Sequence, residues 1–189
     1  MPTYLPAING LRVSQAYAEA MASAPITRVM VSTYEFNHPD FVDEHGANEA
    51  IRIVNEYTDM SFTLESTAPM NPSATVLFTA VPCRVSGPNE SDGGEVQGLS
   101  LEVDGASGEI AKQLDRALNS PIPVTVMERI YASDDTSGPA QLPIIPMTLR
   151  NVSVGDVTVT ANPTFFDASN NSFPRTEYSK AAYGGLASR

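Results

Sequence analysis

The sequence predicts a mainly β domain of about eight strands with two helices and an extended C-terminal arm. Pro (15) and Gly (12) are plentiful, whereas charged residues make up only 17% of the 189 residues, a mix that is typical of short strands joined by turns. Several segments alternate apolar and polar side chains, as half-buried strands do. We expect an N-terminal extension with a helix over residues 1–25, a β-rich core over residues 26–166 and the arm over residues 167–189.

The first half of the chain predicts one helix followed by strands. In "SQAYAEAMASAP", Ser14 can cap the helix, alanines and large apolar residues recur at helical spacing, and Pro25 ends it. Pro82 indicates an edge or a bend within the last strand of this half. The turn-forming stretch "SGPNESDGGE" is a predicted loop. The predicted strands cover residues 26–36, 50–57, 60–66 and 74–85.

The second half predicts a strand, a helix and three further strands. "QGLSLEVD" has the cleanest alternation in the chain, with Leu101 and Val103 on the apolar face, so this strand should be half buried. The helix in "GASGEIAKQLDRALNSP" begins after Ser107 and has a narrow apolar stripe, so it should pack on one surface only. The remaining strands cover residues 122–133, 142–154 and 156–166, of which the last two should pair as a hairpin.

The charge balance disfavours two classes of partner. Eleven Lys and Arg against twenty-two Asp and Glu give a net charge of −11, and this field repels a nucleic-acid backbone or an anionic membrane surface. The start "MPTYLPAING" has no basic residues and no sustained apolar run, and no later segment approaches the length of a membrane span. We expect a soluble protein that is made in the cytoplasm and binds neither membrane nor specific nucleic-acid sequences.

The segment "FNHPDFVDEHGANE" is the first candidate for a metal site, because it holds both His of the chain together with two Asp and two Glu. His38 and His45 are separated by turn-forming Pro39 and Gly46, unlike the His pairs that bind zinc from one helical turn. The alternating acidic pattern of a calcium loop is also missing. The segment therefore predicts a turn after a strand, and we expect no metal ion or other cofactor.

Enzymatic motifs are absent from the sequence. It contains no Gly-x-Ser-x-Gly elbow, no His-Glu-x-x-His and no phosphate-binding loop. Cys83, the single cysteine, lies in the apolar run "VLFTAVPCRV", where a buried structural thiol is the simpler interpretation than a nucleophile. We therefore expect no catalytic residues.

The C-terminal arm differs in kind from the rest of the chain. It is polar and rich in turn-forming residues, yet it carries Phe173, Tyr178, Tyr183 and Leu186 at irregular spacing. Apolar side chains without periodicity are unsuited to a core of their own, which favours a segment that binds to a protein surface. These four residues and Pro174 are the candidate partner-binding residues.

Six segments, taken in order, resemble a family of minor tail proteins of tailed bacteriophages that is catalogued as a domain of unknown function. The resemblance covers roughly residues 26–186, and it rests on the order and spacing of the motifs together. Compared with that family, the insert "VDEHGANE" is longer here and the loop "SGPNESDGGEV" is bulkier. The segments are "TYEFNHPDF", "AIRIVNEYTDM", "GLSLEVDGASGEIAKQLDRAL", "VTVMERIYASDDTSGP", "TLRNVSVGDVTVTA" and "FPRTEYSKAAYGGL".

This resemblance implies a β-sandwich or β-barrel related in architecture to tail-tube and distal-tail proteins. It implies a structural role in the virion, at the tail tip, in a homo-oligomeric ring with other tail proteins and with phage DNA passing through it. The alternative is a receptor- or glycan-binding β-sandwich at the tail tip. Glycan sites usually present aromatic platforms, and the chain has no Trp and few aromatic residues outside the arm.

Overall fold

The fold is mainly β, as the sequence predicts. The computed structural model describes residues 2–23, 28–43, 45–86, 100–104, 108–118, 120–155 and 158–164. Its helices are α1 (Gln15–Ser23) and α2 (Gly108–Leu118). Its strands are β1 (Arg12–Val13), β2 (Met30–Asn37), β3 (Ile51–Val54), β4 (Met60–Thr63), β5 (Thr75–Ala80), β6 (Cys83–Ser86), β7 (Ser100–Asp104), β8 (Thr125–Ala132), β9 (Gln141–Leu142), β10 (Met147–Val154) and β11 (Thr158–Thr164).

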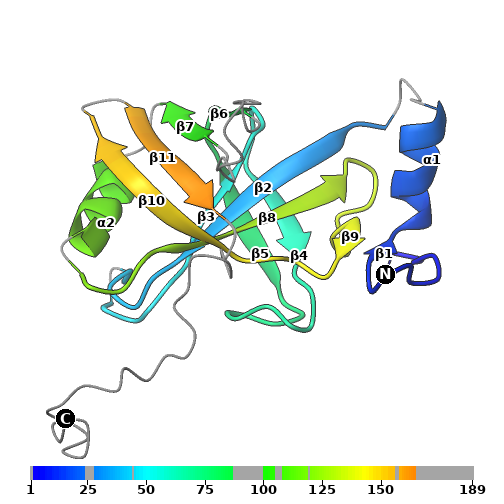
Figure 1. Ribbon diagram of the computed structural model, residues 1–189, viewed down its shortest axis with the longest axis horizontal. Helices are drawn as coiled ribbons and strands as arrows, with labels where there is room; N and C mark the ends of the chain where they lie inside the picture. The colour runs from blue at the N-terminus through cyan, green and yellow to red at the C-terminus, as the bar shows by residue number, and fades with distance from the viewer. Residues whose placement is uncertain are drawn as a thin grey trace, which may run out of the picture.

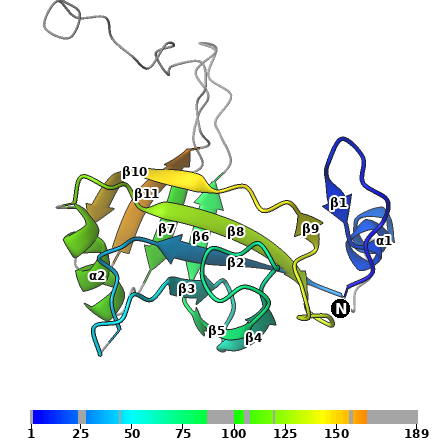
Figure 2. The ribbon, with the colours of Figure 1, turned by 90° about the horizontal axis from the view of Figure 1, so that it is seen from below.

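Nine of the described strands form one sheet in the order β4-β5-β3-β2-β8-β10-β11-β7-β6, and β1 pairs with β9 in a small separate sheet. Figure 2 shows β3, β4 and β5 on one side of β2 and β8, with β10 and β11 on the other. In Figure 1, α1 and β1 lie at one end of the molecule and α2 lies at the opposite end. The longest pairing joins β2 to β8 from Met30↔Ala132 to Asn37↔Thr125, so these two strands are the centre of the fold.

At Val81 and Pro82 the chain passes from β5, near one edge of the nine-stranded sheet, to β6 at the other edge. β5 pairs with β3 and β4, whereas β6 pairs with β7 at the other end of the order. The sequence predicts one strand over residues 74–85 with a bend at Pro82, and the structure has two strands separated there. A strand that bends and changes partners makes a corner, and the corner folds the sheet into a sandwich-like shape.

The larger of two buried clusters lies between the folded halves of the sheet. Leu114 and Ala117 on α2 belong to it, so α2 packs on one surface through the narrow stripe that the sequence predicts. Ser107, the expected cap of this helix, lies outside the described residues, as do residues 87–99 of the expected loop and strand. The strand residues of the cluster include Tyr34, Phe36, Ile53, Val103, Val126, Met147, Leu149, Val159 and Ala161.

The smaller cluster lies on the other side of the central strands, under the β4–β5 hairpin. Phe62 is its centre: the Phe62 ring lies 4.4 Å from the Tyr131 ring and meets Phe78 edge-on at 5.5 Å, measured between centroids. Val31, Val54, Leu64 and Ala68 complete the cluster. The central strands therefore have buried side chains on both faces, which is more burial than a half-buried strand provides.

We predict that Phe62→Ala lowers the free energy of unfolding by about 3–5 kcal/mol, because it leaves a cavity between Phe78 and Tyr131. Chemical denaturation with urea measures the effect. Leu77→Ala on the neighbouring strand is the matched control: Leu77 is 60% exposed, so its loss should cost less than about 1 kcal/mol. If the two substitutions lowered the free energy of unfolding equally, Phe62 would not be the centre of a buried cluster.

Candidate functional site

The segment "FNHPDFVDEHGANE", which was the first candidate for a metal site, forms a turn that is held by its own hydrogen bonds. We call it the acidic loop. His38 is buried, and its Nε2 lies 2.9 Å from the Ile122 carbonyl oxygen while its Nδ1 lies 3.1 Å from the Asp40 amide. Because the backbone amide can only donate, Nδ1 accepts and Nε2 carries the proton. One carboxylate oxygen of Asp43 accepts the amides of His45 and Ala47, both at 2.8 Å.

Two amide side chains fasten this loop to the core. Asn48 donates to the backbone carbonyls of His38, Pro39 and Phe41 at 2.8–3.0 Å. Gln113 of α2 accepts the amide of Val42 at 3.2 Å and donates to the Val42 carbonyl. Within the part of the chain that the structure describes, no three His, Cys, Asp or Glu side chains converge as metal ligands do. These hydrogen bonds hold the backbone of the loop in place between β2 and α2.

Cys83 is partly buried next to the central strands. Burial, and then the negative charge of Glu128, raise the pKa of the Cys83 thiol from 9.0 to about 11. Glu128 also accepts a hydrogen bond of 3.2 Å from the hydroxyl of Tyr34, whose own pKa is raised first by burial. A thiol with a raised pKa is protonated at neutral pH and is a poor nucleophile.

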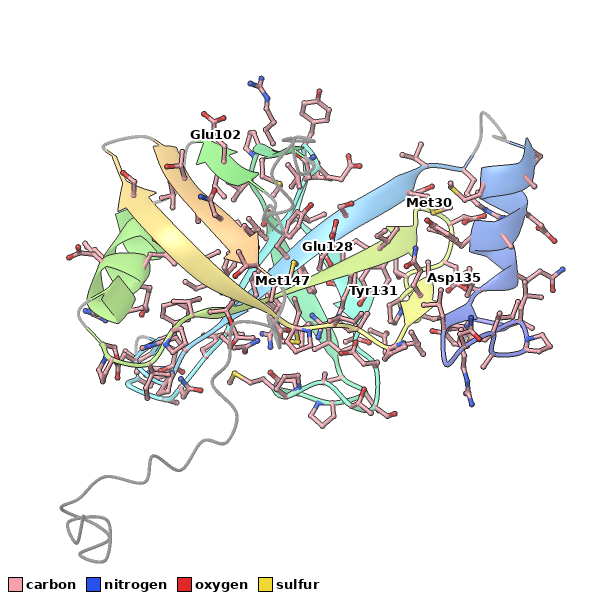
Figure 3. The ribbon with its side chains drawn as sticks, in the orientation of Figure 1. Met30, Glu102, Glu128, Tyr131, Asp135 and Met147 are labelled. Atoms are coloured by element: carbon pink, nitrogen blue, oxygen red, sulfur yellow. The ribbon has the colours of Figure 1, made fainter. Side chains whose placement is uncertain are left out.

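Figure 3 labels Tyr131 on β8. Arg129, two residues before it in the same strand, is the centre of a network of buried charges. The Arg129 guanidinium, fully buried, donates from Nε and Nη2 to the two carboxylate oxygens of Glu65 at 2.8 and 2.9 Å. Its Nη1 lies 3.6 Å from Oε2 of Glu35, which also accepts a 2.9 Å hydrogen bond from Arg52. The network therefore joins β2, β3 and β8 to the segment that follows β4.

The electrostatics of this network favour the charged form of Arg129. Burial lowers the pKa of Arg129, but the hydrogen bonds to Glu65 and the charges of Glu35 and Glu65 outweigh it, so the net shift is upward. Two Arg and two Glu give a neutral group, which a low-dielectric interior tolerates because each charge is paired. Within the described residues, Arg129 Nη1 and Asn37 Oδ1 are buried polar atoms without a hydrogen-bond partner.

The N-terminal residues form a hairpin that projects from the sheet. Ile8 and Leu11 exchange two backbone hydrogen bonds of 3.0 Å around Asn9 and Gly10. Both turn residues have positive φ, 52° and 84°, as a two-residue hairpin turn of type I′ requires. The hairpin is attached to the β9 region, where β1 pairs with β9 and the Tyr4 hydroxyl donates to the Pro139 carbonyl at 2.6 Å.

Helix α1 continues from this hairpin and leaves apolar side chains uncovered. Ser14 caps it as the sequence predicts, since its Oγ accepts the Tyr17 amide at 3.2 Å. No residue of α1 is buried, and Met21 is 69% exposed. On the hairpin Ile8 is 76% exposed, and Leu5 and Leu11 are exposed as well. Residues 2–23 are therefore called the N-terminal unit, a projecting body with several apolar side chains in solvent.

A groove lies between the N-terminal unit and the segment that follows β4. Its larger hollow has a volume of about 550 Å³ and includes Tyr4, Arg12 and Leu142 in its lining. An adjoining hollow of about 250 Å³ is lined by Asn37, Thr125, Met127, Ile144 and Pro146, among others. Glu65 and Thr67 line both hollows, so we call the two together the Glu65 groove.

Sequence reasoning missed these features, although two of them left signals. The dipeptide Asn9-Gly10 between Ile8 and Leu11 is a strong hairpin signal. Charges in the middle of apolar strands, such as Arg129 in "VTVMERIYA", indicate a buried partner of opposite charge. The candidate partner-binding residues Phe173, Pro174, Tyr178, Tyr183 and Leu186 lie outside the described residues.

Comparison with protein families identifies a group to which the sequence belongs. A family model, described as a domain of unknown function (DUF1833), matches residues 16–178. The chain belongs to the DUF1833 family. The DUF1833 match begins in α1, covers the whole nine-stranded sheet and extends into the expected arm as far as Tyr178. No curated protein matches the chain. Among the described residues, no helix is long and apolar enough to span a membrane.

We predict that iodoacetamide alkylates Cys83 about 100-fold more slowly in the folded protein than in urea at mildly alkaline pH, because a pKa raised from 9.0 to about 11 lowers the thiolate fraction by that factor. The rate should rise with pH until the thiol ionises. Mass spectrometry of timed samples measures it. Equal rates in the folded and unfolded chain would show that the fold neither shields the Cys83 thiol nor raises its pKa.

We predict that Arg129→Met destabilises the fold by about 3–5 kcal/mol, because it leaves Glu35 and Glu65 short of a buried positive charge. Arg116→Met on the exposed surface of α2 is the control and should cost less than about 1 kcal/mol. Adding Glu65→Gln to Arg129→Met should recover part of the loss, since one uncompensated charge is removed. Denaturant melts that show no recovery would contradict the pairing.

Proposed function

We propose that this chain is a structural minor tail protein of a tailed bacteriophage. In this proposal it forms part of the tail tip by assembling into a ring with neighbouring tail proteins, in the virion. The observation that carries the proposal is the N-terminal unit, which exposes Leu5, Ile8 and Leu11 on its hairpin and Met21 on α1. Large apolar side chains that a projecting unit leaves in solvent are suited to a protein–protein contact.

The ordered resemblance of six sequence segments to phage minor tail proteins supplies the biological setting of the proposal. A rigid sheet suits a wall segment: the central strands have cores on both faces, and the buried charges fix the β4–β5 hairpin. β4 and β6 are the edge strands of the described sheet. Edge strands and projecting units offer side-by-side contacts, and a closed ring satisfies such contacts without open-ended growth.

The negative net charge of −11 fits a ring that surrounds DNA without holding it. Like charge between a lumen wall and the phosphate backbone prevents sticking. A non-enzymatic role agrees with the chemistry seen: the described carboxylates of the buried network are paired with Arg, and the Cys83 thiol has a raised pKa.

A receptor- or glycan-binding module is the second candidate, and the Glu65 groove is the observation in its favour. Among the described residues that line the groove, Tyr4 is the single aromatic one, and its hydroxyl is already bonded to Pro139. Glycan sites rely on exposed aromatic faces, so the structural role is favoured.

We predict that a phage genome that encodes this chain, but with its gene interrupted by an amber codon, yields particles without a functional tail tip. Complementation with the full chain should restore infectivity. Complementation with a chain that lacks residues 172–189 should not restore it, although we expect this variant to melt cooperatively, because the sequence of the arm lacks the periodicity of a core segment. Leu77→Ser, at an exposed position of β5, is the control that should restore infectivity.

Normal infectious particles from the interrupted gene would exclude a structural role at the tail tip. Loss of the cooperative melt on removal of residues 172–189 would place the arm in the core of the domain.

A further inference from the structure

We propose that the Glu65 groove is the receptor for residues 165–189 of a second copy of this chain. This inference rests on the proposed ring assembly, and it adds the surface that receives the arm and the identity of its occupant. Four observations carry it: the shape of the groove, the point at which the arm begins, the length of the arm, and the chemistry of both surfaces.

The groove has the form and lining that an extended segment needs. Its two hollows, of about 550 and 250 Å³, adjoin at Glu65 and Thr67 and extend from the N-terminal unit to the start of β10. Leu142, Ile144 and Pro146 supply apolar lining along this path. An elongated apolar groove with separate hollows binds an extended peptide by receiving side chains at intervals.

The arm begins next to the smaller hollow. The last described residue of β11, Thr164, pairs with Thr148 of β10 in an antiparallel ladder. Pro146, which lines the smaller hollow, precedes Thr148 by two residues. In each subunit, therefore, the root of the arm and the receiving groove lie on the same part of the surface. Adjacent copies in a ring can then exchange arms in one direction around the ring.

The arm is long enough to reach a neighbour. Residues 165–189 follow β11, and an extended chain of this length spans roughly 80 Å at about 3.3 Å per residue. A compact domain formed by the preceding residues is roughly 40 Å across. The reach of the arm thus exceeds the width of its own domain about twofold, which suits a link between subunits.

The two surfaces match in chemistry. Residues 165–189 contain Arg175, Lys180 and Arg189 against Asp167 and Glu177, so they carry a net charge of +1, and residues 1–164 carry −12, for a total of −11. A weakly basic arm is therefore attracted to the acidic domain of a neighbour.

Apolar groups match as well. Leu142 lines the larger hollow, and Ile144 and Pro146 line the smaller one. The apolar residues Phe173 and Tyr178 of the arm are suited to the apolar part of the lining.

A second copy fits the groove better than the chain's own arm does. The larger hollow is lined by Tyr4, Gly10 and Arg12 of the N-terminal unit, at the end away from β11. The exposed apolar side chains of Ile8 and Leu11 belong to the same hairpin. A neighbour that packs against these side chains brings its arm to this end of the groove, so one contact covers both surfaces.

The test uses the full chain with a photo-crosslinking benzoylphenylalanine in place of Thr67, an exposed residue that lines both hollows. Equal amounts of unlabelled and ¹⁵N-labelled protein are mixed at rising concentration, irradiated, digested and analysed by mass spectrometry. The expected products join position 67 to peptides of residues 165–189, and about half of them pair a light with a heavy chain. The same probe in place of Leu77, outside the groove, should not give arm products.

Four results would overturn the inference. Arm products that never pair light with heavy chains would identify the chain's own arm as the occupant. Products that exclude residues 165–189 at every concentration, or equal yields from positions 67 and 77, would remove the groove as the receptor.

As a second variant, Phe173→Ser with Tyr178→Ser in the full chain should weaken arm binding roughly 100-fold, because two apolar anchors are lost, while the melt stays unchanged. An unchanged yield of arm products from this variant would likewise count against the proposal.

These outcomes are independent of where the protein works. Failure of the crosslinks in a chain that is present in the tail would leave the proposed function standing and remove only the groove as the arm receptor. If the crosslinks form but the chain is absent from phage particles, the groove remains the receptor of the arm and the proposed function is wrong.

Discussion

The pairing of Arg129 with Glu65 and Glu35 is the interaction on which the rest of the structure depends. Arg129 lies in the central strand β8, Glu35 lies in its neighbour β2, and Glu65 lies after β4. The bidentate contact between Arg129 and Glu65 therefore fixes the β4–β5 hairpin over the sheet, above the cluster around Phe62. A buried pair of this kind specifies one arrangement, because any other leaves a charge uncompensated in the interior.

The same pairing shapes the surface. Glu65 belongs to the buried network and also lines both hollows of the groove, so the groove's position follows from the position of the network. At the other end of the groove, the N-terminal hairpin is held by β1–β9 pairing and by the Tyr4 hydroxyl on Pro139. The groove is thus formed by parts that are held firmly, which lowers the entropy lost when a segment binds.

The arrangement separates two roles along the chain. The central strands have cores on both faces and supply rigidity, while the N-terminal unit keeps apolar side chains in solvent. Such a division suits a subunit that folds alone and then joins neighbours. In the proposed assembly, the exposed apolar side chains of the N-terminal unit are a contact surface for a neighbour.

Most of the secondary structure could be predicted from the sequence, because it follows from local patterns. The strand with buried Val103, the helical stripe with Leu114 and Ala117, and the bend at Pro82 each appear where the sequence predicts them. The buried network could not be predicted in the same way, because its members are distant in the sequence and period-two alternation assigns Glu35 and Arg129 to a polar face. That face is covered because the β4–β5 hairpin and the segment that follows β4 fold over it. The groove depends on the same long-range contacts, and the arm residues that were expected to bind partners lie outside the described part of the chain.

Cryo-electron microscopy of the intact particle tests the central claim most directly. The account predicts that the chain can be traced in a symmetric ring at the tail tip, with its N-terminal unit against a neighbour and residues 165–189 of each copy in the groove of the next. A particle with no density for this chain in the tail would contradict the structural role, and a ring in which the N-terminal unit faces solvent would contradict the assembly surface.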